Sequence, residues 1–263
     1  MLTIKNYVRA QSLEEAYDLN QKKSNCIMGG MMWLRMTTRT VQTMIDLCDL
    51  GLNKIEESPE EFSLGAMVSL HQLELHTGLN EYTNGCVTKA LQDIVGVQFR
   101  NGATLGGSIF GRFGFSDVLT IFLAMDSYVE MFKGGIIPLN EFVKMPYDRD
   151  VLVRIIVKKI PATFSYQAMR IQRTDFPVLT CACSKVGGTY KAVIGARPGK
   201  AVLVLDEENI LANGIDEKSS EKFATFVANS IETKKNTRGS AEYRKHLAKV
   251  LTTRAINEAG GIL

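Results

Sequence analysis

Two loops that each contain a pair of consecutive glycines have the residue types best suited to holding a ligand. One spans Ile27–Trp33 (IMGGMMW) and the other Thr104–Ser108 (TLGGS). Glycine lacks a Cβ, so its backbone can approach a ligand closely and its N–H groups can converge on an anion. A diphosphate has oxygens on two phosphorus atoms, and two such loops could hold it from both sides. The other Gly-Gly pairs, at 134–135, 187–188 and 260–261, have the surroundings of hairpin turns or of a tail.

Other motifs for nucleotide binding or catalysis are not supported. The sequence has no G-x-G-x-x-G after a strand, and Gly195–Lys200 (GARPGK) is one residue short of a P-loop and lacks the following Ser or Thr. A β-turn that carries a solvated lysine accounts better for that segment. His71 and His76 are five residues apart, which does not suit a same-face metal pair on a helix. The five cysteines lack CxxC spacing, which argues against a metal or iron–sulfur site held by this chain alone. The Cys181–Cys183 pair has strand alternation, which indicates buried, inert thiols.

Composition bounds the class of protein. The chain has 263 residues, of which 45% are hydrophobic and 22% charged, and its net charge is +3. These values are ordinary for a globular protein of two or three compact units, and they include no basic stripe suited to nucleic acid. The N-terminus has early acidic residues and no long apolar run, and no stretch approaches the roughly 20 apolar residues of a membrane span. We expect a cytoplasmic protein without membrane contact.

The first half of the chain has the pattern of a small α/β unit, ending near residues 55–60, and then a second unit. Ser12–Glu15 forms a capping box ahead of an apolar helical face. Ser116 and Asp117 are placed to cap a later apolar helix that runs to Met125. Further predicted elements are strands at 26–28, 43–47, 62–67 and 151–157, a helix that buries Leu70, Leu73 and Leu75, a glycine-rich loop at 100–109, and a hairpin around Lys133–Gly135.

From about residue 161 the pattern predicts a separate α+β domain. A hairpin is expected from Val178 to Ile194 around Gly187-Gly188, and a further strand at 201–205. Two helices close the chain, the second capped by Ser240. We expect three strands with the helices on one face of the sheet.

Several segments, in order, resemble the FAD-binding subunit of the xanthine dehydrogenase and carbon monoxide dehydrogenase family. The most specific are the stretch Arg100–Asp126 and the block Arg238–Lys245 (RGSAEYRK). Shorter likenesses are Ser12–Ala16, Met28–Gly30 and Leu64–Glu74. Together they cover essentially the whole chain.

The resemblance implies an α+β fold in which a two-subdomain FAD-binding domain is followed by a C-terminal α+β domain with a small antiparallel sheet and helices. Residues 1–160 would form the first domain, with subdomains at about 1–57 and 58–160, and residues 161–263 the second. The family further implies an oxidoreductase subunit that assembles with an iron–sulfur (2Fe–2S) subunit and a molybdopterin-binding subunit. Electrons would pass from the partner's clusters through FAD to NAD or another acceptor.

The resemblance also implies which residues hold FAD. Backbone N–H groups of both glycine pairs would bind the diphosphate. Asp117 would lie near the flavin, or else cap its helix, and Trp33 would stack on a ring or fill the core. Arg170, Arg173 and Asp175 would line a cleft or form surface ion pairs. The implied cofactor-binding residues are Ile27, Met28, Gly29, Gly30, Met31, Met32, Trp33, Thr104, Gly106, Gly107, Ser108 and Asp117.

Three departures from the family pattern leave alternatives open. Met31–Trp33 stands where Thr or Ser and a polar residue are usual, Ser108 replaces an Asn, and Gly111–Phe115 replaces a proline-rich stretch. Methionine cannot donate a hydrogen bond. One alternative is therefore a scaffold subunit that binds flavin weakly or not at all, and another is a standalone flavin reductase or oxidase. The substrate of an assembled enzyme would be bound by a different polypeptide.

Overall fold

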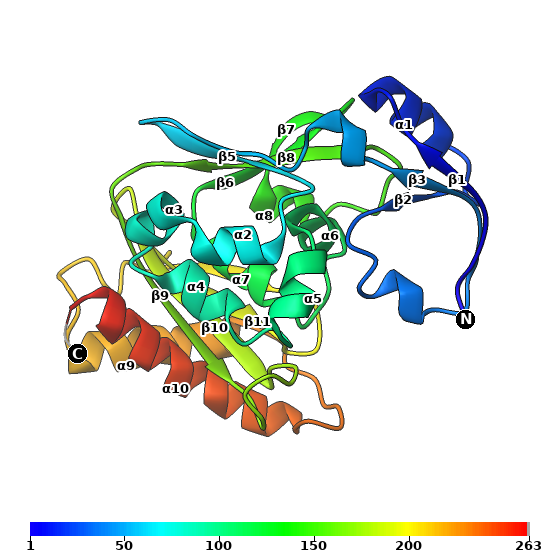
Figure 1. Ribbon diagram of the computed structural model, residues 1–263. Coiled ribbons are helices and arrows are strands. Elements are labelled where there is room, and N and C mark those ends of the chain that lie inside the picture. Colours follow the sequence, from blue (N-terminus) through cyan, green and yellow to red (C-terminus); the bar gives the residue numbers. More distant parts are fainter. Residues whose placement is uncertain (262–263) are drawn as a thin grey trace. The chain divides into compact units, whose positions relative to one another are not determined.

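The computed structural model describes residues 1–261 (Figure 1). The chain divides into two compact units, each built from separate stretches of sequence. The first unit comprises Met1–Leu73, Val97–Gly111 and Ser127–Val157. The second unit comprises Glu74–Gly96, Arg112–Asp126 and the chain from Lys158 onward.

A three-stranded parallel sheet in the first unit carries the first glycine loop. Its order is β1-β3-β2, and α1 connects β1 to β2. The Ser12 hydroxyl accepts from the Glu15 N–H at 3.1 Å, and the Glu15 carboxylate accepts from the Gln11 N–H at 2.7 Å, so the predicted helix cap is confirmed. The predicted strand that leads into the glycine pair is also confirmed. The bounds are β1 Thr3–Arg9, α1 Leu13–Asn20, β2 Cys26–Met28, η1 Leu34–Met36, β3 Thr40–Asp46 and η2 Cys48–Leu50.

A five-stranded sheet of order β4-β5-β8-β6-β7 completes the strands of the first unit. The expected hairpin is confirmed, with Met131 opposite Gly135. Leu70 and Leu73 are buried as predicted, but Leu75 is 66% exposed, because the helix ends there after less than two turns. The bounds are β4 Ile55–Glu57, β5 Glu61–Gly65, α2 Leu70–Leu75, β6 Ser127–Met131, β7 Gly135–Pro138, α8 Leu139–Phe142 and β8 Leu152–Lys158.

The stretch predicted as a glycine-rich loop is instead helical. Helix α5 (Val97–Gly102) and helix α6 (Leu105–Phe110) follow each other closely. Thr104 is the N-cap of α6, and Leu105 and Ile109, one helical turn apart, are both fully buried. A cap and one apolar face therefore stabilise a helix across two glycines, whose intrinsic helix propensity is poor.

An antiparallel sheet of order β12-β11-β10-β9 forms the centre of the second unit. Helices α9 and α10 pack side by side, and α10 packs on β9 and β10 (Figure 1). The sheet has four described strands rather than the three predicted, because β9 was not recognised. Helix α7 packs on β10 and β11. The bounds are α3 Thr77–Tyr82, α4 Cys86–Leu91, α7 Asp117–Ala124, β9 Ala162–Met169, β10 Leu179–Val186, β11 Thr189–Gly195, β12 Val202–Leu205, α9 Glu217–Ser230 and α10 Ala241–Ala259.

The alternation of side chains along β10 shows that helices cover both faces of this sheet. Cys181 and Cys183 are fully buried, and the Cys181 Sγ lies 3.6 Å from the Thr252 hydroxyl of α10. On the opposite face, the Thr180 hydroxyl lies 2.9 Å from that of Thr120 in α7, and the Ser184 hydroxyl donates to the Ala124 carbonyl at 2.6 Å. The prediction of helices on one face was therefore incomplete. Within residues 1–261, no helix has the length and apolarity needed to cross a membrane.

Candidate functional site

The first loop, Ile27–Trp33, leaves the parallel sheet directly after β2. Met28 pairs with Asp46 on β3, which fixes the point where the loop begins. Met31 has a φ of +62°, and its carbonyl then accepts from the Arg35 N–H at 3.1 Å as η1 begins. A left-handed backbone costs a residue with a Cβ roughly 1–2 kcal/mol. No local pattern in the sequence indicates that a methionine adopts this conformation, which tightens the turn after the glycines.

The backbone N–H groups of the first loop are the distinctive feature of the site. Those of Gly29, Gly30, Met31 and Met32 donate to no other residue in the described part of the chain. The four residues are also only partly buried. Successive N–H groups in a tight turn with a left-handed residue form a concave site for an anion. The first loop can therefore bind the oxygens of a phosphate or diphosphate through its backbone.

The second loop, Thr104–Ser108, forms the start of α6, and its N–H groups are already used. The Gly106 N–H donates to the Ala66 carbonyl at 2.8 Å, and the Gly107 N–H donates to the Thr104 hydroxyl at 3.2 Å. The Ser108 N–H and hydroxyl both donate to the Thr104 carbonyl, at 3.1 and 2.9 Å. The N–H groups of Gly106, Gly107 and Ser108 thus each have an acceptor within the protein. A ligand would have to compete with these bonds.

The two loops pack directly against each other, a contact that the sequence analysis did not predict. A Cβ on Gly29 would lie 2.9 Å from the Thr104 hydroxyl oxygen and 3.8 Å from the Gly107 Cα. A Cβ on Gly30 would lie 1.7 Å from the Gly102 carbonyl oxygen. Gly30 is therefore required for the close approach of the first loop to the end of α5, just before the second loop, in addition to any close approach to a ligand. The second loop supports the conformation of the first.

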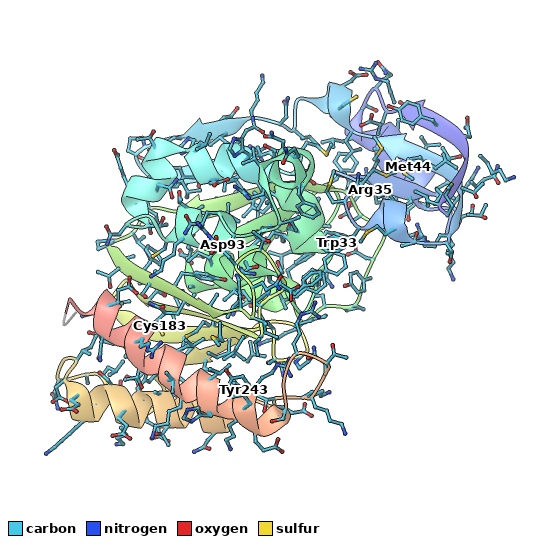
Figure 2. All side chains as sticks on the ribbon, turned by 60° about the horizontal axis from the view of Figure 1, so that its bottom comes forward. Trp33, Arg35, Met44, Asp93, Cys183 and Tyr243 are labelled. Carbon is cyan, nitrogen blue, oxygen red and sulfur yellow. The ribbon has the colours of Figure 1, made fainter. Side chains whose placement is uncertain are left out.

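Met32 and Trp33 continue this contact. A Cβ on Gly102 would lie 2.2 Å from the Met32 Cε, so the methionine side chain covers this glycine. The Trp33 ring meets the Phe99 ring edge-on, with centroids 5.7 Å apart, and Trp33 stays partly exposed (Figure 2). Trp33 thus packs against the Phe99 ring and keeps some accessible surface.

Asp117 belongs to the second unit, and its carboxylate is bound within that unit. It accepts hydrogen bonds from the Tyr166 hydroxyl and, at 2.5 Å, from the Arg170 guanidinium. Burial raises the pKa of the Asp117 carboxyl, while Arg170 and Tyr166 act in the opposite direction. Ser116 caps α7, because its hydroxyl accepts from the Leu119 N–H at 3.0 Å. Asp117 therefore joins α7 to β9 and the segment after it, rather than capping the helix.

The other charged residues singled out after β9 form ion pairs. Arg173 donates to Asp93 at 2.8 Å, and Asp175 accepts from Arg238 at 3.0 Å, a bond that lowers the pKa of Asp175. These contacts match the ion-pair alternative. Arg244, in the block that resembles the family, is fully buried, a feature that the sequence analysis missed. Its guanidinium donates to the carbonyls of Val178, Lys234 and Gly239 and to the Asn236 side chain.

Among residues 1–261, no group of three or more His, Cys, Asp or Glu side chains is arranged to hold a metal ion. Cys181 and Cys183 have their sulfurs 3.9 Å apart on one face of β10. The neighbouring Cys181 and burial together raise the pKa of the Cys183 thiol well above its usual range. The Cys183 thiol is therefore not a ready ligand or nucleophile, and Cys181 is fully buried.

Comparison with known protein families gives the class of the chain. Residues 2–162 match the FAD-binding domain of molybdopterin dehydrogenases, and residues 164–259 match the C-terminal domain of the carbon monoxide dehydrogenase flavoprotein. The chain therefore belongs to this family of FAD-binding oxidoreductase subunits, and the resemblance drawn from the sequence is confirmed. An FAD-binding domain is thus present, and the first loop lies within the matched residues.

Individual relatives match this chain over nearly the whole length of both proteins. The chain is 28% identical to the nicotine 6-hydroxylase medium subunit of Paenarthrobacter nicotinovorans, over 97% of this chain and 96% of the relative. It is 25% identical to the glyceraldehyde dehydrogenase medium chain of Sulfolobus acidocaldarius, over 96% and 97%. The solved carbon monoxide dehydrogenase of Hydrogenophaga pseudoflava contains a chain with a TM-score of 0.87 and 20% identity, covering 97% of this chain and 96% of that one. This likeness confirms the predicted fold class.

Proposed function

We propose that this chain binds FAD through the first loop and relays electrons from the iron–sulfur clusters of a partner subunit to NAD or another acceptor. The observation that carries the proposal is the row of N–H groups from Gly29 to Met32, which have no acceptor among the described residues and remain partly accessible. A diphosphate fits them, because its charge is negative and its oxygens accept several hydrogen bonds.

Each part of the site has a distinct task in this proposal. Ile27 and Met28 hold the start of the loop in the parallel sheet, and Gly29 to Met32 bind the diphosphate. Thr104 and Gly107 support the loop through their contact with Gly29, and Gly106 and Ser108 hold α6 in place through their bonds to Ala66 and Thr104. The partly exposed ring of Trp33 offers an aromatic surface beside the bound cofactor. FAD itself supplies the electron-transfer chemistry when it is bound.

In this proposal, the second loop and Asp117 do not contact the diphosphate directly, although the family resemblance implies that they are cofactor-binding residues. The N–H groups of Gly106, Gly107 and Ser108 contribute support rather than ligand contacts. Asp117 contributes through the position of α7, because its carboxylate is already bonded to Tyr166 and Arg170 and a buried negative charge would repel a diphosphate. We therefore assign the diphosphate to the first loop.

The names of the relatives support the proposed partners. One is the medium chain of a dehydrogenase, and the other is the medium subunit of a hydroxylase. We propose that the present chain likewise assembles with an iron–sulfur subunit and a molybdopterin-binding subunit. A cytoplasmic location completes the proposal.

An absorbance spectrum of freshly purified native protein, followed by acid release of the cofactor, tests the central step. We expect flavin bands and released FAD near one per chain, and co-purification of the two partner subunits from the native source. Rapid bleaching by NADH would identify the nicotinamide nucleotide as an electron partner. A folded, colourless protein that takes up no added FAD would contradict the proposal and favour a scaffold subunit.

A further inference from the structure

The methionine side chains of the first loop are a feature that FAD binding does not explain. The first glycine pair is followed directly by Met31 and Met32, and Met31–Trp33 stands where the family usually has Thr or Ser and then a polar residue. The backbone N–H groups of these positions would serve a diphosphate equally well with other side chains. The choice of methionine therefore needs an explanation of its own.

The Met32 side chain packs the first loop onto the end of α5. A Cβ on Gly102 would lie 2.2 Å from the Met32 Cε and 3.4 Å from its Sδ, so the thioether lies against the Gly102 backbone. The Gly102 carbonyl oxygen lies 1.7 Å from the place of a Cβ on Gly30. Met32 and Gly30 therefore both contact the last residue of α5, and the Met32 contact bears directly on the position of the loop.

Trp33 (labelled in Figure 2) continues this contact and reports on it. Its ring meets the ring of Phe99 on α5 edge-on, with centroids 5.7 Å apart. Trp33 is the only tryptophan of the chain, so tryptophan fluorescence reports the surroundings of this contact alone. A change at Met32 that moves the loop away from α5 would thus alter the emission of the neighbouring Trp33.

The thioether of Met32 is open to oxidation. Met32 is partly exposed, so a small oxidant in the solvent can reach its Sδ. Hydrogen peroxide transfers one oxygen atom to the sulfur: an S–O bond forms, the O–O bond breaks, the sulfur loses two electrons, and the other peroxide oxygen leaves as water with both protons. Methionine sulfoxide reductases reverse the change with a dithiol, which becomes a disulfide while the sulfoxide oxygen leaves as water.

Exposure and packing together separate Met32 from other methionines of the chain. Met44, Met125 and Met131 are at most 3% exposed, so an oxidant in the solvent does not reach their sulfurs. Met36, at the end of η1, is 64% exposed, so most of its side chain is already in water and oxidation costs it little packing. Met32 combines access to solvent with a close contact on which the first loop depends.

We propose that Met32 is an oxidation site, and that its sulfoxide moves the first loop off α5 and weakens the binding of FAD by Gly29–Met32. The proposal rests on the proposed binding of FAD by this loop and adds a reversible regulation to it. A sulfoxide oxygen on Sδ is a polar acceptor that needs water, and it adds volume to a contact that is already close. The loop must therefore shift, and its N–H groups lose the arrangement that suits a diphosphate.

The test treats the full-length protein, first stripped of any cofactor, with hydrogen peroxide and locates the sulfoxides by mass spectrometry of its peptides. We expect the Trp33 emission to move to longer wavelength as the Met32 sulfoxide accumulates, because the ring leaves Phe99 for water. The affinity for FAD, measured by fluorescence titration, should fall about tenfold with the loss of this apolar contact. Methionine sulfoxide reductases with a dithiol should reverse both changes.

Three variants separate Met32 from the other sulfurs. Met32→Leu keeps an apolar side chain of similar volume and removes the sulfur, so its emission and FAD affinity should be the same before and after peroxide. Met36→Leu is the matched control and should respond to peroxide as the wild type does. Met32→Gln places a permanent polar group at the contact, so it should show the shifted emission and weaker FAD binding without peroxide.

Wild-type protein in which Met36 is fully oxidised while Met32 stays a thioether would overturn the proposal. So would a Met32 sulfoxide that leaves the Trp33 emission or the FAD affinity unchanged, or a Met32→Leu protein that responds to peroxide as the wild type does. If Met32→Leu does not fold, the reductases decide, since changes that persist after Met32 is reduced would exclude it as the cause. Wild-type protein that binds no FAD before oxidation, but whose Trp33 emission follows the Met32 sulfoxide reversibly, would contradict the FAD proposal and leave the oxidation site standing.

Discussion

The two glycine loops of this chain are similar in sequence and different in what their backbones do. In the first loop, the N–H groups of Gly29 and Gly30 have no acceptor among the described residues, whereas in the second those of Gly106 and Gly107 are both bonded within the protein. The difference shows that a Gly-Gly pair can serve either ligand binding or close packing. In the proposed site, the first pair binds the diphosphate and the second pair supports the loop that contains the first.

The difference arises from the elements on either side of each pair. The first pair leaves a strand and enters a turn in which Met31 is left-handed. The second pair lies in the first turn of α6, where the hydroxyl of the N-cap Thr104 accepts a hydrogen bond from the Gly107 N–H. The Gly106 N–H donates to the carbonyl of Ala66, the residue that follows β5. In the second loop, the helix cap and the end of a neighbouring strand therefore accept hydrogen bonds from the N–H groups. In the first loop, the turn leaves the corresponding N–H groups without an acceptor among the described residues.

The largest effect on stability is expected at Asp117, which lies outside both glycine loops. The same variant tests whether the FAD site is confined to the first loop. Asp117→Ala leaves Arg170 without its carboxylate in a pair whose side chains are 5% and 9% exposed. Breaking a buried pair costs about 3–5 kcal/mol, so we expect a large fall in the free energy of unfolding by urea. The affinity of the remaining folded protein for FAD should stay within about threefold of wild type.

Asp93→Asn is the matched control, because its partner Arg173 is 77% exposed and an exposed pair contributes only about 0–1 kcal/mol. A loss of FAD affinity in Asp117→Ala, with little change in stability, would instead place Asp117 at the cofactor.

Gly30→Ala disrupts the packing of the first loop on the end of α5, just before the second loop. The added Cβ would lie 1.7 Å from the Gly102 carbonyl oxygen, so one backbone must move. Overpacking of this kind costs about 1–3 kcal/mol, and we expect FAD affinity to fall by about 10- to 100-fold in a fluorescence titration. Gly107→Ala is the contrast, because its Cβ meets only the Thr104 side chain, at 3.0 Å. Equal losses in the two variants would show that the loops do not differ as described.

Thr104→Ala removes the cap of the second loop and leaves the donors of the first unchanged. Loss of an N-cap costs about 1 kcal/mol, which corresponds to a Tm lower by about 2–4 °C in a chain of this size. We expect a smaller decrease in FAD affinity than in Gly30→Ala, and recovery of Tm in Thr104→Ser. Complete loss of FAD with an unchanged Tm would make Thr104 a direct ligand.

The smallest effect concerns the sheet that carries the first loop. The hydrogen bond to Asp46 is the main cause that raises the pKa of Tyr7 to about 12. Because the folded pKa lies above the ordinary value of about 10, the stabilisation is present below that pH and is lost as the pH rises through about 12. Tyr7→Phe should therefore flatten the alkaline decline in stability, as measured by urea unfolding across this range. An identical alkaline decline of the free energy of unfolding in Tyr7→Phe and wild type would exclude the Tyr7–Asp46 hydrogen bond as the cause.

Local signals in the sequence predicted much of the fold. Ser12, Ser116 and Ser240 cap their helices as expected, because capping depends only on residues a few positions apart. Strand β9 was missed although Phe164 and Tyr166 alternate with polar residues, because residues 170–178, which lead to β10, contain no glycine turn to mark a hairpin. The fold class came from the family resemblance rather than from periodicity.

The site was predictable only in part. The two glycine loops were singled out from the sequence, but their direct contact was not. The acceptors of the second loop, Ala66 and Val68, lie far earlier in the chain, and no local pattern reveals them. The left-handed Met31 was not predictable either, since methionine has no preference for that conformation. The partners of Asp117 likewise depend on tertiary contacts, with Tyr166 and Arg170 about 50 residues away.

Amide hydrogen exchange of the two loops, with and without FAD, tests the central claim most directly. The account predicts that FAD slows exchange at Gly29 to Met32, whose N–H groups would gain acceptors, and leaves Gly106 to Ser108 nearly unchanged because their donors are already bonded. Protection gained in the second loop without protection in the first would contradict it.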